Sequence, residues 1–244
     1  MKKQLFFFII LLCSCQFSFS QKATGKYLFP MYPGDKSWKE TRYPIRIKAL
    51  EIPDSILSRL TNTQLIGACF EYPFFINLFA FDNYDEGFKN LCHIFNGYTE
   101  LLKRKNIEDD LINFYDEMLS FKFKDKNSLY NEFYNPLKFY LIEEIISQDQ
   151  IINNLDSIQR KKLFFICKEK FLMKKSNSEV FEGQPVFSDV SLKSTMLIIG
   201  KLVLKEKLIS DISIITACQD IILSKSLPVT IYENIIEAFE KIYK

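Results

Sequence analysis

Residues 230–243, with the sequence TIYENIIEAFEKIY, decide the fold class of this chain. The apolar residues of this stretch recur at spacings of three and four, so they share one face of an α-helix. They are Tyr232, Ile235, Ile236, Phe239 and Tyr243. Thr230 and Glu233 have the spacing of a capping box, in which each side chain bonds the backbone N–H of the other residue. The stretch therefore predicts an amphipathic helix that begins at Thr230.

The same helical spacing recurs along the chain. It is present in Phe88, Leu91, Cys92 and Phe95, in Leu111, Phe114, Tyr115 and Met118, and in Leu163, Ile166, Cys167 and Phe171. Thr61 and Gln64 form a capping box that predicts a helix start. Further helices, separated by polar segments, are expected from near Asn106, Ser128, Asp156 and Val190. The pattern indicates roughly nine or ten short antiparallel helices of about three turns each. Because no repeat of fixed length is found, we expect an all-α fold that is an irregular stack, either α-solenoid-like or an orthogonal bundle.

Two features bear on where helices end. Pro73 disfavours the α conformation of Tyr72, so the helix that starts at Thr61 should end near these residues. Asn96–Gly97 predicts that a second helix ends after Phe95 through a residue in the left-handed conformation. Residues 196–204 are rich in β-branched and other apolar residues and are interrupted by Gly200. A strand stays open there as an alternative to a helix, because short apolar runs are ambiguous by periodicity alone.

The first twenty residues have the layout of a cleaved export signal. Lys2 and Lys3 precede an apolar run over 5–12, and Ser18 and Ser20 lie just before Gln21. The run of about eight residues is too short to cross a membrane, which takes roughly 20. A second interpretation is that Cys15, preceded by Leu12, is acylated as in bacterial lipoproteins. Both interpretations place the protein outside the cytoplasm, in the periplasm, at the cell surface or in the medium.

Composition bounds the remaining possibilities. The 244 residues predict a signal peptide over 1–20, an irregular leader over 21–52 that contains Pro30, Pro33 and Pro44, and a single helical domain over 53–244. There are 32 basic and 30 acidic residues, and the two lysines of the signal account for the difference. Without a basic excess we expect neither a nucleic-acid partner nor a polybasic membrane-binding segment.

Four cysteines follow the signal, namely Cys69, Cys92, Cys167 and Cys218. Four thiols allow three disulfide pairings, and the sequence does not choose among them. Each cysteine lies in an apolar helical stripe, which favours buried free thiols over a disulfide framework.

The familiar catalytic and metal-binding patterns fail on inspection. His93 is the only histidine, and as the neighbour of Cys92 on a helix it is poorly placed to share a proton or metal with it.

The acidic run 82–87 resembles a calcium loop but has Tyr84 and His93 at positions that need carboxylates, so Asn83 and Glu86 are better explained as a helix cap. The neighbouring carboxylates Asp109–Asp110, Asp116–Glu117 and Glu143–Glu144 are expected on solvated helix faces. We therefore predict no metal and no cofactor.

Aromatic residues are densest between Phe70 and Phe88, and most of them are expected in the core. Around this segment the chain resembles a group of uncharacterised, exported, all-helical bacterial proteins. The resemblance covers 36–120 and is carried by Cys69-Phe70-Glu71-Tyr72-Pro73, Phe79 to Asp82, Asn83-Tyr84 with Glu86-Gly87-Phe88, and Phe95-Asn96-Gly97-Tyr98 followed by Glu100-Leu101. It implies export and helicity and assigns no catalytic residue.

Three functional hypotheses follow. The first is a non-enzymatic exported interaction or scaffold protein with a protein or peptide partner, whose candidate binding residues are Glu71, Tyr72, Asp82, Tyr84, Tyr98 and Glu100. The second is an exported hydrolase whose carboxylates, from among Glu71, Asp82 and Glu100, are brought together by the fold. The third is a subunit of an envelope assembly that is anchored through a lipid on Cys15.

Overall fold

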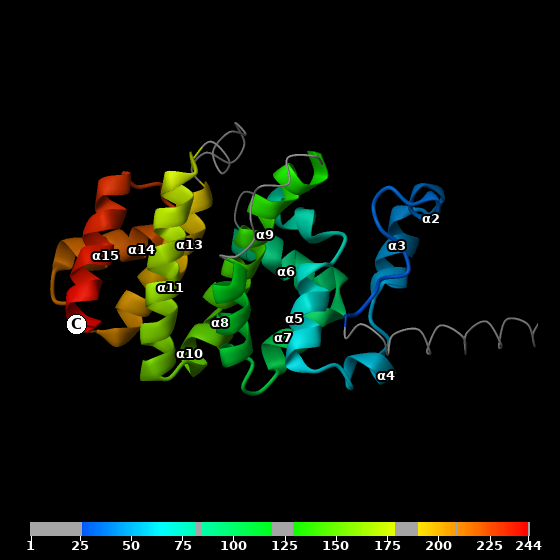
Figure 1. Ribbon diagram of the computed structural model, residues 1–244, viewed down its shortest axis with the longest axis horizontal. Coiled ribbons are helices and arrows are strands. Elements are labelled where there is room, and N and C mark those ends of the chain that lie inside the picture. Colours follow the sequence, from blue (N-terminus) through cyan, green and yellow to red (C-terminus); the bar gives the residue numbers. More distant parts are fainter. Residues whose placement is uncertain (1–25, 82–83, 119–128, 179–189, 208, 244) are drawn as a thin grey trace, which may run out of the picture.

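The computed structural model describes residues 26–81, 84–118, 129–178, 190–207 and 209–243 (Figure 1). Within these ranges every regular element is a helix, so the prediction of an all-α fold is confirmed. The export segment with Cys15, and the candidate residue Asp82, lie outside the described residues.

The described ranges contain thirteen α-helices and one 3-10 helix. They are α2 (Lys36–Glu40), α3 (Tyr43–Leu50), α4 (Asp54–Leu57), α5 (Asn62–Phe70), η2 (Phe75–Ala80), α6 (Tyr84–Ile94), α7 (Asn96–Lys103), α8 (Glu108–Glu117), α9 (Leu129–Ser147), α10 (Asp149–Asn154), α11 (Ser157–Ser176), α13 (Val190–Glu206), α14 (Ile212–Ile222) and α15 (Val229–Tyr243). The lengths are more varied than the expected three turns, because α9, α11 and α13 have 19, 20 and 17 residues.

The helices follow one another along the long axis of the molecule, from α2 and α3 at one end to α14 and α15 at the other (Figure 1). In the first half α5 packs against α7 and α8, and α6 packs against η2 and α7. In the second half α13 is central, since it contacts α9, α11 and α14. One continuous apolar core runs through the stack, from Tyr27 to Phe239.

Local capping signals locate several helix starts correctly. The capping box at Thr61 and Gln64 is present, and a second box, Asp156 with Gln159, starts α11. Helices α8, α9 and α13 begin within two residues of the predicted positions. The box expected at Thr230 is wrong, because α15 already begins at Val229 and the Ile231 N–H donates to the carbonyl of Pro228.

Three other expectations are corrected. Residues 196–204 are helical within α13, so the strand alternative is wrong. Asn96 and Gly97 open α7, and neither has the positive φ of a left-handed stop, although α6 does end at Ile94. The leader is not irregular over its described part: it contains α2 and α3, and Tyr27 and Phe29 are buried in the core. The Phe29 ring lies 5.7 Å from the ring of Phe95, so the leader is packed and is not loosely draped on the surface.

Of two helical glycines that face a neighbouring element, only Gly87 permits an approach that a side chain would block. A Cβ on Gly87 in α6 would lie 2.2 Å from the carbonyl oxygen of Leu78 in η2. At Gly200 in α13 the corresponding position lies 3.5 Å from the carbonyl oxygen of Cys218 in α14, which is ordinary contact. Gly87 is therefore required by packing, which explains this glycine without a calcium loop.

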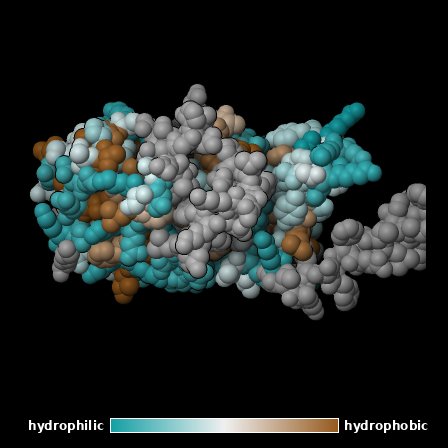
Figure 2. Space-filling view, turned by 45° about the horizontal axis from the view of Figure 1, so that its top comes forward, coloured by the Kyte–Doolittle hydropathy of each residue, from teal (hydrophilic) through white to brown (hydrophobic). Residues whose placement is uncertain are grey.

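The surface is mixed in character. Hydrophobic and hydrophilic residues alternate over the α14–α15 end of the face seen in Figure 2. Ile212 and Leu223 at this end are 78% and 69% exposed. Among the helices of the described ranges, none is both long and apolar enough to cross a membrane.

Candidate functional site

The structure places two of the candidate binding residues in the core. Tyr72 and Tyr98 are fully buried, and their hydroxyls donate to the backbone carbonyls of Ile94 and Cys69 at 3.3 and 2.8 Å. The Tyr72 ring stacks on Phe95 with 4.1 Å between centroids. Burial raises the pKa of both hydroxyls. Binding by these rings requires exposure that they lack, so their role is to hold α5, α6 and α7 together.

Glu100 also has a structural partner. Its carboxylate lies 2.7 Å from Nε of Arg104, the residue that directly follows α7. The Arg104 guanidinium in turn donates to the carbonyls of Leu57 and Leu60 at 2.8 and 2.7 Å. Glu100 thus orients an arginine that caps the end of α4 and the following turn. The hydrolase hypothesis needs two carboxylates that meet, and the contacts of Glu100 do not join it to Glu71.

The acidic loop is only partly described. Asp82 and Asn83 lie outside the description, and Tyr84 is known only as the first residue of α6, without its side chain. His93 is exposed in the last turn of α6. Across the described residues no cluster of three or more histidine, cysteine, aspartate or glutamate side chains has the geometry to hold a metal ion.

Among the candidate binding residues, Glu71 lines a hollow in the protein surface. A groove of about 270 Å³ opens between α5 and α8 and is lined by Lys26, Thr63, Gln64, Gly67, Phe70, Glu71 and Phe114. This volume is slightly below the roughly 300 Å³ at which pockets for whole small molecules begin. The groove is therefore suited to one or two side chains. We call it the α5–α8 groove.

Paired contacts fix the two walls of the α5–α8 groove. At one end the Asn62 side-chain amide donates to Asp110 Oδ2 at 3.1 Å. At the other end Phe70 and Phe114 meet edge to face with 5.0 Å between centroids. Gly67 lies between these contacts, and a Cβ built on it would have no atom within 4 Å. The missing side chain at Gly67 thus leaves an open socket over an aromatic floor.

Lysines surround the Glu71 carboxylate at the end of α5. Lys138 Nζ from α9 lies 3.0 Å from Glu71 Oε1 and 4.6 Å from the centroid of the Phe70 ring. Lys26 Nζ lies 3.7 Å from the same oxygen, and its side chain is 50% exposed, against 16% for Lys138. Burial lowers the pKa of Lys138, and the neighbouring Glu71 opposes that change. Lys138 is therefore committed to Glu71, whereas Lys26 keeps an accessible ammonium.

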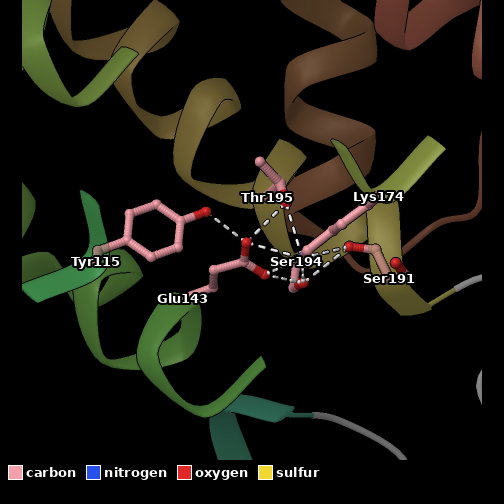
Figure 3. Close-up of polar contacts among 6 residues, drawn as sticks. All are labelled: Tyr115, Glu143, Lys174, Ser191, Ser194 and Thr195. Carbon is pink, nitrogen blue, oxygen red and sulfur yellow. Dashed lines mark hydrogen bonds and ion pairs between the residues drawn. The ribbon is translucent and has the colours of Figure 1, made fainter. Parts of the chain in front are cut away.

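The densest polar cluster of the described chain lies inside the second half of the stack (Figure 3). Lys174 Nζ in α11 donates to both carboxylate oxygens of Glu143 in α9, at 2.8 and 2.6 Å. Tyr115 from α8 and Thr195 from α13 donate to Glu143 Oε1 at 2.5 and 2.8 Å, and Ser194 donates to Oε2. We call these five residues the Glu143 cluster, and it joins four helices.

The Glu143 cluster is closed to solvent. Glu143 and Lys174 are both 0% exposed, and Lys174 has further acceptors in the Ser191 carbonyl and the Thr195 hydroxyl at 2.9 and 3.0 Å. Burial lowers the pKa of Lys174, while burial and the nearby Glu143 raise the pKa of Tyr115. A serine, a lysine and a carboxylate in contact are a combination that nucleophilic enzymes use, but such a nucleophile must reach its substrate. With every group enclosed and hydrogen-bonded, the arrangement joins helices.

A second lysine of α11 is buried beside the cluster. Lys170 is 0% exposed, and its Nζ donates to the Asp116 carbonyl at the end of α8 at 3.0 Å. The same ammonium lies 5.1 Å from the centroid of the Tyr115 ring. Burial lowers the pKa of Lys170 to about 8, although Asp116 and Glu143 oppose this change. A cation at a helix C-terminus is favourably placed, which helps to keep it charged in the interior.

The expectation of a solvated face at Glu143 and Glu144 is wrong. Glu143 is 0% and Glu144 only 4% exposed. The signal that could have indicated this is the run LKFYLIEEIIS over 137–147, in which apolar residues surround the two glutamates on every side of the helix. A helix that is apolar all round is a buried helix, and charges within it need buried partners. The lysine and hydroxyl partners carry no comparable signal, because they lie on other helices.

The four cysteines within the described ranges form no disulfide. Cys69, Cys167 and Cys218 are buried, and Cys92 is half-buried. Burial raises the pKa of Cys92 to about 11 and that of Cys218 to about 12. The prediction of buried free thiols is thus confirmed for three of the four.

Comparison with known proteins adds no homologue. No family model, no curated protein and no solved structure matches the chain. The resemblance to exported helical proteins stays a prediction.

Proposed function

We propose that this protein acts outside the cytoplasm as a non-enzymatic interaction module that holds a segment of a partner polypeptide in the α5–α8 groove. The observation that carries the proposal is the groove itself, an aromatic floor with an open socket at Gly67 and charged groups at its rim. Apolar pockets with a few polar groups at their edge are the usual sites of recognition. Export is supported by the lysine, apolar and small-residue layout of 1–20.

Two further features support an interaction role. The groove walls belong to helices that are fixed at both ends by Asn62–Asp110 and Phe70–Phe114, which gives a partner a preformed surface. The most reactive combination of side chains, the Glu143 cluster, is enclosed and serves to join helices. The accessible polar groups at the groove are suited to recognition, and Glu71 there is already neutralised by lysine.

Site-specific photocrosslinking in the native cells tests the proposal. A photoreactive amino acid at position 63, on the exposed rim of the groove, is expected to capture one discrete polypeptide. Gly67→Trp fills the socket from an open position, so it should abolish capture without disturbing the fold. Asn234→Trp, at an exposed site on α15 at the far end of the stack, is the matched control and should leave capture unchanged. Absence of a captured polypeptide, or capture that survives Gly67→Trp, would contradict the proposed function.

A further inference from the structure

We infer that the segment held in the α5–α8 groove contains an aliphatic or aromatic side chain next to an acidic residue, whose carboxylate is bound by Lys26. The inference rests on the proposed function and specifies the ligand. It follows from the size of the groove, from its floor and from the charges at the Glu71 end.

Size and floor define the apolar part of the ligand. The volume of about 270 Å³ admits one or two side chains. The floor consists of the Phe70 and Phe114 rings, which offer no hydrogen-bond partner, so a side chain that enters must be apolar. Because Gly67 contributes no side chain and a Cβ built there would have no atom within 4 Å, the groove is open at this point to a branched or aromatic group.

Charge defines the polar part of the ligand. At the Glu71 end two lysines face one carboxylate, and Lys138 Nζ lies 3.0 Å from its Oε1. Lys26 is farther away, at 3.7 Å, and half of its side chain is exposed. Its ammonium can therefore turn to an incoming carboxylate while Glu71 keeps Lys138. A basic ligand would instead meet two ammonium groups beside a single carboxylate.

Hydrogen-bond donors at the rim point to the same conclusion. The oxygen of the Gln64 side chain accepts from the Thr61 N–H at 2.9 Å in the capping box, so its amide nitrogen is the group left to face a ligand. Thr63 adds an exposed hydroxyl next to it. The other nearby acid, Asp110, accepts from Asn62 and is not among the lining residues. Together with Lys26, the Gln64 amide and the Thr63 hydroxyl can therefore donate to a ligand that supplies acceptors.

The test is an NMR titration of the isotope-labelled protein, read at the backbone amides of Gly67 and Thr63. The probes are four amidated, acetylated hexapeptides with the central pairs Leu-Glu, Leu-Gln, Leu-Lys and Ser-Glu. We expect the Leu-Glu peptide to bind about three- to five-fold more tightly than the Leu-Gln peptide, which is the range for one exposed ion pair. The Ser-Glu peptide should bind more weakly than either, since it leaves the socket empty. Added salt should reduce the preference for glutamate.

Two variants separate the ligand chemistry from the proposed function. Lys26→Ala should remove the preference for Leu-Glu over Leu-Gln and leave the affinity for Leu-Gln unchanged. Gly67→Trp should abolish the shifts with every peptide. Equal binding of Leu-Glu, Leu-Gln and Leu-Lys to the wild type would overturn the acidic ligand and leave the groove as a binding site. Absence of shifts at Gly67 with all peptides would overturn both the ligand and the groove.

Discussion

The Lys174 ammonium lies 2.6 Å from Glu143 Oε2, and neither side chain is exposed to solvent. Burying two charges costs several kcal/mol each, and the loss is recovered only when geometry and additional hydrogen bonds are good. Here Tyr115, Ser194 and Thr195 supply those bonds from two further helices. The pair therefore specifies how α8, α9, α11 and α13 meet, because any other packing would leave a buried charge unsatisfied.

Removing one member of this pair should be costly. Lys174→Met leaves the Glu143 carboxylate buried without its cation, and we expect a loss of about 3 to 5 kcal/mol in the free energy of unfolding. The double variant Glu143→Leu with Lys174→Met removes both charges and should be more stable than the single variant. Urea denaturation followed by circular dichroism measures both values.

A surface pair supplies the control for that experiment. Lys36 and Glu40 lie 3.8 Å apart with side chains that are 87% and 65% exposed. Lys36→Met should therefore change stability by less than about 1 kcal/mol. A Lys174→Met variant that is as stable as Lys36→Met would show that the buried pair is not formed in solution.

Two helical glycines should respond in opposite directions to the same substitution. Gly87→Ala places a Cβ 2.2 Å from the Leu78 carbonyl oxygen, so α6 and η2 must separate, and a loss of about 1 to 3 kcal/mol is expected. Gly67→Ala meets no atom within 4 Å and replaces glycine inside a helix, which should stabilise the protein by up to about 1 kcal/mol. Thermal unfolding of the two variants and the wild type measures the difference. Equal effects would contradict the close approach at Gly87.

Helix starts could be predicted from the sequence where interactions between residues close in the chain determine them. The starts of α5 and α11 were predictable because a capping box is completed within four residues. The start of α15 was misplaced by one residue, because Thr230 matches the pattern although the carbonyl of Pro228 begins the helical bonding. Asn96–Gly97 marked a true boundary, but the pattern could not tell the end of α6 from the start of α7.

The candidate sites depended on distant parts of the chain and were predicted less well. Glu71 was singled out from its surroundings in the sequence, yet its partners Lys26 and Lys138 lie 45 and 67 positions away. Lys174 lies 31 positions from Glu143, and Thr195 lies 52. No local spacing encodes such contacts, since they arise only when the helices stack. The burial of Tyr72 and Tyr98 could not be predicted from local spacing for the same reason, because it is a consequence of packing.

The thiols should be inaccessible in the folded protein. Cys69, Cys167 and Cys218 are buried, and burial raises the pKa of the half-buried Cys92 to about 11, so little thiolate is present at neutral pH. We expect a thiol reagent to react slowly with Cys92 alone in native protein that has lost its export segment. All four should react at once in denaturant, with or without prior reduction. Fewer than four reactive thiols before reduction, and four after it, would reveal a disulfide.

Glu144 is buried in α9 beside the Glu143 cluster, and its ionisation should make stability depend on pH. Its carboxylate accepts from the Gln148 side chain at 2.8 Å. Burial raises the pKa of Glu144 from an ordinary 4.5 to about 7, Lys201 opposes that change, and Asp85 reinforces it. Between these two values the folded protein binds more protons than the unfolded chain, so stability must fall as the pH rises from 4.5 to 7.

Glu144→Gln should remove this dependence, because glutamine is neutral at every pH. At about 1.36 kcal/mol per pKa unit, the wild type should lose on the order of 3 kcal/mol across the interval relative to the variant. The variant should consequently be the more stable protein above pH 7 and should lose that advantage near pH 4.5. Urea denaturation of both proteins at several pH values between 4.5 and 8 measures the difference. Parallel curves would mean that Glu144 stays ionised when folded and that water or a cation reaches it, which its 4% exposure argues against.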